Sequence, residues 1–239
     1  EHRSGLPEWA PLFHDAPGRD PALAEIGRLG ARARPQGRVY SDLGMMLLGG
    51  LLEQVGDASL DELVDALVLQ PLGLASTGYR PARGAGPLAA TSTGNPVEAG
   101  MLAEHRPELA DRDLTTQPWW RPRVLVGEVN DANAAIAFDG VAGHAGLFST
   151  ADDLLRYGTQ LLRALHGAST GPLEPSVVRR FAAPGREAGQ GLGLWRRRIA
   201  DTLGRPGADD SVGHRGFTGC ELLVSPAERL VVVLLSNRL

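Results

Sequence analysis

The sequence contains no lysine, since all 24 of its basic residues are arginine. It has one cysteine, Cys220, and its longest apolar run, Leu230 to Leu235, is far too short to span a bilayer. One cysteine excludes an internal disulfide, although it leaves the redox compartment open. With 239 residues and 43% hydrophobic residues, the chain can instead be stabilised by an ordinary buried core.

Charge argues against a nucleic-acid partner. The formal net charge is −4, and the arginines are scattered, with Arg196 to Arg198 forming the one run. No set of histidines, cysteines or carboxylates has metal-ligand spacing, and Asp131, Asn133 and Asp139 do not form a calcium loop. We therefore expect neither a metal nor a cofactor.

The first residues carry no recognisable targeting signal. The sequence opens Glu1-His2-Arg3-Ser4, with neither an initiator Met nor an apolar signal region. The composition therefore leaves the localisation open between the periplasm, the extracellular space and the cytoplasm. It also leaves the oligomeric state open.

Hydrophobic periodicity predicts several helices. Apolar residues at 43, 47, 48, 51, 52 and 55 predict a largely buried helix that is capped by Ser41 or Asp42 and ends at Gly56. Capping boxes predict a helix over 59–69, packed against the first, and an amphipathic helix from Thr150 to about Leu165. Two more helices are expected over 21–34 and 174–183.

The C-terminal part has the period of strands. We expect strands over 191–199, 219–225 and 229–236, the last two joined as a hairpin across Pro226-Ala227-Glu228. Helices followed by an antiparallel meander indicate an α+β fold rather than a doubly wound sheet.

Residues 80–135 contain many turn residues and few periodic ones, which predicts a long ordered excursion. Loops of this length are usually functional. Within it lies the pair Trp119-Trp120, which together with Trp9 could line a substrate cleft or serve equally well as core anchors.

Tyr40 stands where an extended segment meets the helix that starts at Ser41. A phenol has a pKa near 10, so it relays protons near neutrality only where positive charge or a helix dipole favours the phenolate. The alternative is a tyrosine that secures the helix start by packing.

The segment Gly213-His214-Arg215-Gly216-Phe217-Thr218-Gly219 precedes the hairpin, and its glycines allow a ligand to approach the backbone. The Phe217 N–H is the candidate donor to an acyl-transfer oxyanion. His214 could orient or protonate a substrate, or it could be an ordinary turn histidine. His144, in another glycine-rich turn, is interpreted as a packing residue.

Taken in order, these segments resemble the β-lactamase-related serine hydrolases, which include penicillin-binding carboxypeptidases and esterases. H-R-S-G-L-P at 2–7 resembles the family's H-T-S-G-L-P, and V-Y-S-D-L-G at 39–44 resembles its Y-S-N element. G-V-A-G-H-A-G-L-F-S-T-A-D-D-L and G-H-R-G-F-T-G complete a likeness over nearly the whole chain.

The resemblance implies a β-lactamase/transpeptidase-like fold and a role for each matching residue. Tyr40 would act in general acid/base proton transfer, and Asp42, which replaces the common Asn, would contact substrate. His214, Arg215 and Gly216 would correspond to the K-T-G or H-T-G edge strand and, with Phe217, bind substrate. The charge of Asp42 and the size of Arg215 favour an ester or peptide over a β-lactam.

The family's S-x-x-K motif, in which serine attacks and lysine takes its proton, cannot exist without lysine. We therefore expect residues 1–239 to be a partial domain, incomplete at both ends, with a mainly helical region over 1–170 and a helix with antiparallel strands over 171–239. A Ser/Lys pair upstream would complete the hydrolase, and this chain alone is predicted to be inactive. The substrate would be a small molecule or a peptide. Alternatives are a non-catalytic binding protein that uses the remaining cleft for a cell-wall peptide or a partner, and a fragment without function.

Overall fold

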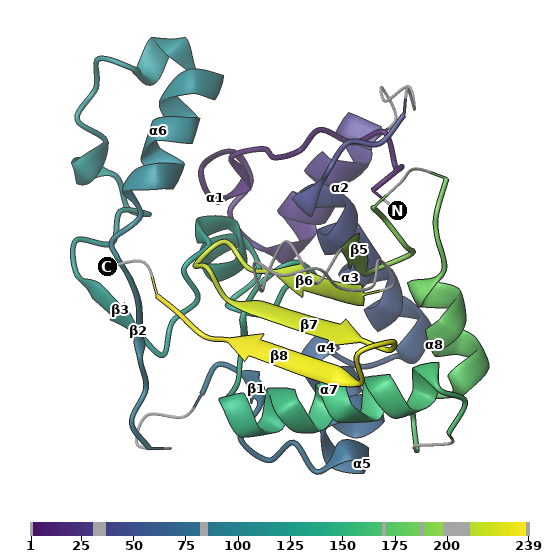
Figure 1. Cartoon of the computed structure of the whole chain (residues 1–239). Coiled ribbons are helices and arrows are strands. Elements are labelled where there is room, and N and C mark those ends of the chain that lie inside the picture. Colours follow the sequence, from purple (N-terminus) through teal and green to yellow (C-terminus); the bar gives the residue numbers. More distant parts are fainter. Residues whose placement is uncertain are drawn as a thin grey trace. The chain divides into compact units, whose positions relative to one another are not determined.

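The computed structural model describes residues 2–30, 37–81, 86–168, 171–186, 189–197 and 211–237 (Figure 1). Two compact units divide the chain. The sheet unit comprises Val64–Thr77 and Ser149–Ser236, and the helical unit comprises His2–Leu63 and Gly78–Phe148. The division expected at residue 170 stays a prediction.

The sheet unit is built on four antiparallel strands in the order β5-β6-β7-β8. The predicted hairpin is confirmed, because Ser225 pairs with Leu230 across the expected turn. The strands are shorter than predicted, and residues 198 and 199 of the first expected strand lie outside the described residues. Their bounds are β5 Trp195–Arg197, β6 Ser211–Arg215, β7 Glu221–Ser225 and β8 Leu230–Leu234.

Two helices pack against this sheet, and both were predicted. Figure 1 shows α7 (Ala151–Leu165) alongside β8, with α8 (Pro175–Ala182) next to it. Leu161 and Val178 form a core with Val212 and Val224 of the strands. Helix and sheet approach closely at Gly158, where a Cβ would meet the Val231 side chain.

The cap of α7 differs in one respect from the predicted capping box. The Thr150 hydroxyl accepts the Asp153 N–H at 3.2 Å, as predicted. The Asp153 carboxylate, however, accepts from the Ser76 N–H and the Thr77 hydroxyl, both at 2.8 Å. A distant loop thus takes the place of the local partner.

The helix predicted over 59–69 begins as expected and extends three residues further. The Ser59 N–H donates to the Glu62 carboxylate at 3.0 Å, which is half of the predicted capping box. Gly73, with a positive φ of 66°, ends the run. In order it comprises α4 (Leu60–Val64), the π-helix η1 (Asp65–Leu69) and α5 (Gln70–Leu72).

The helical unit begins with α1 (Leu12–Asp15), α2 (Arg19–Gly30) and α3 (Asp42–Gly56). α2 is the helix predicted over 21–34, of which residues 31–34 lie outside the described residues. Among the described helices, none is long and apolar enough to cross a membrane.

α3 corrects one expectation. It starts and ends where predicted and contacts the start of α4, since the Leu60 N–H donates to Glu53 at 2.8 Å. It is not largely buried, however, because Leu51 is 52% exposed and Val55 78% exposed. Leu43 and Met46 supply its buried side. Periodicity identifies an apolar face, but it does not say that a partner covers that face.

The excursion over 80–135 contains regular structure that the sequence analysis missed. A short hairpin pairs β2 (Ala90–Thr93) with β3 (Val124–Val126), and α6 (Pro96–His105) lies between them in the chain. The remaining elements are the 3₁₀ helices η2 (Pro107–Leu109) and η3 (Leu114–Thr116), the π-helix η4 (Asn133–Ala137), and the paired strands β1 (Gly78–Tyr79) and β4 (Leu147–Phe148).

Gly143 allows the turn over 142–146 to lie directly on α3. A Cβ there would overlap the Met45 carbonyl oxygen and would lie 3.3 Å from the Gly49 nitrogen. A backbone carbonyl cannot move aside as a flexible side chain can. The glycine is therefore required by close packing.

Gly143→Ala is expected to lower the free energy of unfolding by about 3 kcal/mol, since overpacking against backbone forces a shift of the turn or the helix. Gly100→Ala is the matched control, because no atom lies within 4 Å of a Cβ at that exposed position in α6. It should stabilise the chain slightly through helix propensity. Urea denaturation measures both, and equal effects would contradict the packing argument.

Candidate active site

The segment 2–8 runs beside the turn that carries Tyr40 and holds it by hydrogen bonds from both backbone and side chains. The Ser41 N–H donates to His2 Nδ1 and the Asp42 N–H to the Glu8 carbonyl, both at 3.0 Å. The Ser41 hydroxyl donates to the Pro7 carbonyl at 2.6 Å and accepts the Gly44 N–H at 3.2 Å as the N-cap of α3. The turn Tyr40-Ser41-Asp42 is thus fixed by the segment 2–8 and by the first turn of α3.

His2 also contacts the Tyr40 ring, with the ring centroids 4.2 Å apart. Because its Nδ1 accepts the Ser41 N–H, that nitrogen carries no proton. His2 has a positive φ of 51°, an uncommon conformation for a non-glycine residue. In the sequence this histidine belongs to the segment H-R-S-G-L-P, and no contact with Tyr40 or Ser41 was predicted for it.

Tyr40 is 37% exposed, and its surroundings favour the neutral phenol. Burial raises the pKa of Tyr40, the charge of Asp42 raises it further, and Arg38 partly offsets both. Among the described residues of this chain, the environment thus favours a proton donor at neutral pH. A phenolate would need additional positive charge.

Asp42 lies in the first turn of α3, half-buried and close to other charges. Burial raises the pKa of Asp42, and the negative charges of Asp131 and Glu8 add to this effect. The positive charge of His144 acts in the opposite direction. The ionisation of Asp42 therefore depends on His144.

His144 forms an ion pair with Asp131, Nε2 to Oδ1 at 3.1 Å, and its side chain is 5% exposed. Burial alone would lower the pKa of His144, but the charge and hydrogen bond of Asp131, together with Asp42, outweigh it and raise the pKa. Burial would raise the pKa of Asp131, but His144 and the Ala134 N–H lower it. This ion pair was not predicted from the sequence, in which Asp131 and His144 are 13 positions apart.

The segment that carries Asp131 is itself tightly held. Arg121 donates to the Val129 carbonyl at 2.8 Å and also to the Asn130 carbonyl. Glu98 accepts the Ala132 N–H at 3.2 Å. Burial raises the pKa of Glu98 and lowers that of Arg121. Asp131 is thus fixed from both flanks.

Trp9 and Trp119 belong to the core rather than to a described cleft. Their side chains are buried, and they pack with Phe13, Leu102 and Ala132. Of the two readings left open by the sequence, the core reading agrees with these contacts.

The sheet unit carries His214 and Arg215 at the end of β6. β5 pairs with β6 as far as Gly213, so within the described residues His214 and Arg215 pair with β7 alone. β6 is therefore an interior strand whose last two residues extend beyond β5. The correspondence of His214 to Gly216 with the family's edge strand stays a prediction.

The two side chains differ in charge. His214 Nδ1 lies 2.8 Å from the Arg215 carbonyl oxygen, and its ring lies 4.8 Å from Trp195. Burial lowers the pKa of His214, which favours the neutral imidazole, and the bond to that carbonyl partly offsets this effect. Arg215 is held by an ion pair from Nε to the buried Glu221 at 3.0 Å.

Gly216 and Phe217 form the turn between β6 and β7. The Gly216 N–H donates to the Cys220 carbonyl at 2.7 Å, which closes the turn, and the Phe217 side chain is exposed. The four residues His214 to Phe217 are thus contiguous in the sheet unit, whereas Tyr40 and Asp42 belong to the helical unit. Their assigned roles stay predictions.

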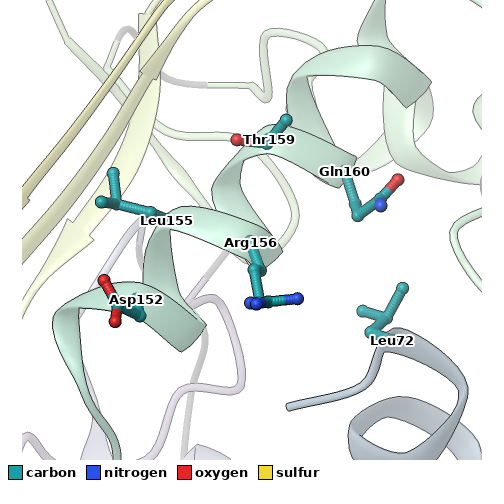
Figure 2. A pocket seen from close by; sticks show the side chains of 6 residues that line it. All are labelled: Leu72, Asp152, Leu155, Arg156, Thr159 and Gln160. Carbon is teal, nitrogen blue, oxygen red and sulfur yellow. The ribbon is translucent and has the colours of Figure 1, made fainter.

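A shallow depression on α7 is a separate feature. Figure 2 shows it between α7 and Leu72 of α5. Its volume is about 540 Å³. It contains no predicted site residue, and no nucleophile there lies beside a base. Its lining consists of Leu72, Asp152, Leu155, Arg156, Thr159 and Gln160.

Asp131→Asn is expected to lower the free energy of unfolding by about 3 kcal/mol near pH 6, because it leaves a buried charge without its partner. The contribution of His144, whose pKa is raised, is complete below pH ~6.5 and is lost as pH rises through its folded pKa. That of Asp131, whose pKa is lowered, is complete above pH ~3.9 and is lost in acid.

The difference between wild type and Asp131→Asn should therefore be largest between about pH 4 and 6.5 and smaller at pH 9, as measured by urea denaturation. Asp139→Asn is the control, since Asp139 pairs with Arg80 while 91% exposed and should show little effect. A difference that does not change with pH would contradict a charged pair.

Comparison with known proteins agrees with this architecture. The chain is 31% identical over 211 residues to a putative D-alanyl-D-alanine carboxypeptidase of Escherichia coli K12. It is 32% identical over 209 residues to an N-acetylmuramyl-L-alanine amidase of Bacillus subtilis. Each match includes 84% of this chain, which spans 45% and 44% of the respective relatives.

Solved structures share the fold. The crystal structure of a penicillin-binding protein from Bacillus halodurans superposes with a TM-score of 0.62 at 18% identity, covering 99% of this chain and 67% of that one. The predicted α+β, β-lactamase and penicillin-binding-protein type of fold is thereby confirmed. The Beta-lactamase family model matches residues 1–239, and the chain therefore belongs to the Beta-lactamase family of hydrolases.

Proposed function

We propose that this chain supplies the proton-transfer and substrate-binding residues of a serine hydrolase whose nucleophilic Ser-x-x-Lys motif lies outside the 239 residues. The observation that carries the proposal is the turn Tyr40-Ser41-Asp42, which hydrogen bonds hold to the segment 2–8. This turn places the ionisable side chains of Tyr40 and Asp42 at the start of α3. A rigid first turn is what general acid/base catalysis needs, since a proton donor must remain within hydrogen-bond reach of the reacting atoms.

The proposed reaction is acyl transfer to serine and then to water. The serine oxygen attacks the substrate carbonyl carbon while the lysine amine takes the serine proton. The leaving group departs with a proton, and Tyr40, a neutral phenol in this chain, is suited to donate it. Water then attacks the acyl carbon and gives a proton to the Tyr40 phenolate, and the released serine oxygen takes back its proton from the lysine ammonium, which restores all three groups. An ammonium group beside Tyr40 would supply the positive charge that favours its phenolate.

An amide or peptide is the substrate class that the relatives favour, because two of them are named a carboxypeptidase and an amidase. A non-catalytic binding protein is the alternative, and the absence of lysine from these 239 residues favours it for the chain taken alone. Turnover of a substrate distinguishes the hydrolase from the binding protein.

The protein expressed from its complete natural reading frame should react with a fluorophosphonate at a serine of an S-x-x-K motif, and the 239-residue chain should not react. Tandem mass spectrometry of the labelled peptide locates the serine. Tyr40→Phe should slow labelling at least tenfold, since general acid/base groups contribute about 10²–10⁴.

Tyr157→Phe is the matched control, because Tyr157 packs in the core of the sheet unit. It should label at the wild-type rate. A natural protein that binds its ligand but neither labels nor hydrolyses an ester would establish the binding alternative. Labelling of the 239-residue chain itself would refute an external nucleophile.

Asp42→Asn should alter substrate preference rather than abolish activity. Removing a negative charge favours substrates with a free carboxylate, by about tenfold in kcat/KM for each 1.4 kcal/mol of repulsion relieved. The measurement compares a peptide with its C-terminal amide in the natural protein. An unchanged ratio would show that Asp42 does not face the substrate carboxylate.

A further inference from the structure

Among the buried ionisable groups that the proposed reaction does not use, His144 lies in a turn that packs on α3. His144 is 5% exposed, and Nε2 is engaged by Asp131. The other nitrogen, Nδ1, is inaccessible to solvent and has no hydrogen-bond partner among the residues that the structure describes. A buried donor without a partner is costly, so this imidazole is not accounted for by packing alone.

The backbone holds His144 where it is. Gly143 lies against the Met45 carbonyl of α3, so the turn cannot move toward the helix. Gly146 has a positive φ of 114°, and a Cβ there would overlap the Gly140 carbonyl oxygen. The Tyr79 hydroxyl donates to the Ala142 carbonyl at 3.4 Å. His144 therefore follows a residue that packs on Met45, three positions after Asp42 in α3, and the turn that carries the imidazole has little freedom.

Charge connects this turn to Asp42. The groups that act on Asp42 are His144, Asp131 and Glu8, and His144 is the positive one among them. The groups that act on His144 are Asp131 and Asp42, both negative. Beyond Asp131, Arg121 and Glu98 complete the cluster.

We propose that His144, held by Asp131, is the positioning residue for Asp42: its imidazolium fixes the location and the charge of the carboxylate that the first turn of α3 presents. Asp131 orients the ring through Nε2. Asp42 then acts on the ring through its charge, since Nδ1 has no hydrogen-bond partner among the described residues. The importance of this interaction for turnover rests on the proposed function, since Asp42 is expected to contact substrate. The interaction itself can be tested on the 239-residue chain.

NMR titration tests it directly. The His144 ring resonances, assigned by their loss in His144→Gln, should titrate with a midpoint above the ordinary value of about 6.5. In Asp42→Asn the midpoint should move to lower pH. In His144→Gln the Asp42 carboxylate carbon should titrate at higher pH than in wild type, because the stabilising positive charge is gone.

Asp139→Asn, which removes an exposed carboxylate from the same unit, is the control and should leave the His144 midpoint unchanged. A His144 midpoint that is the same in wild type and Asp42→Asn would overturn the proposal. If His144→Gln does not fold, that comparison remains available with the ring assigned through the sequential backbone resonances of His144.

Hydrolysis by the natural protein then separates the two claims. His144→Gln should move to higher pH the midpoint at which kcat/KM for a peptide, relative to its C-terminal amide, changes, because Asp42 then ionises at higher pH. A purely structural role would lower kcat/KM for both substrates without moving that midpoint. NMR coupling together with an unmoved midpoint would overturn the positioning role in catalysis. Coupling together with a natural protein that has no hydrolytic activity would support the charge interaction and refute the proposed function.

Discussion

The hydrogen bonds between the segment 2–8 and the turn 39–42 are the constraint on which the helical unit depends. α3 starts at this turn, and Ser41 both caps the helix and donates to Pro7. Each such bond contributes only about 1 kcal/mol net, but an unpaired buried N–H would cost more. The main effect of these bonds is therefore to fix one geometry for Tyr40 and Asp42, and their contribution to the free energy of unfolding is smaller.

The other candidate residues of the helical unit are connected to the start of α3 through packing and hydrogen bonds. The turn with Gly143 lies on α3, His144 follows it directly, and Asp131 meets His144 from a segment held by Arg121 and Glu98. Buried ion pairs contribute little to stability compared with apolar packing, yet removing one partner is expensive. Such a pair is best understood as a device that fixes the charge beside the start of α3.

Local patterns in the sequence predicted much of this fold. α7 and the β7–β8 hairpin have strong periodicity and short-range caps or turns, so their signals lie within a few residues. α6 was missed because its buried residues are Glu98 and Leu102, so that its inner face is partly polar and gives no clear apolar pattern. α3 was wrongly predicted to be largely buried, because periodicity identifies an apolar face but does not show whether another element packs on it.

The candidate site shows a similar division. Tyr40 and Asp42 were found because they lie together in one motif at a helix start. The bonds from His2 and the pair between Asp131 and His144 join residues that are far apart in the chain, and no spacing rule connects them. His144 was read as a packing residue because its glycine neighbours do indicate tight packing, which is correct for Gly143 but incomplete for the imidazole.

Amide hydrogen exchange at Ser41, Asp42 and Gly44 tests the central claim, that this turn is fixed before any substrate binds. Their N–H groups donate to His2, the Glu8 carbonyl and Ser41, so all three should exchange as slowly as amides within α3. His2→Ala should accelerate Ser41 while leaving α7 unchanged. Exchange of Ser41 and Asp42 at the rate of an unprotected loop in the wild-type chain would contradict the account.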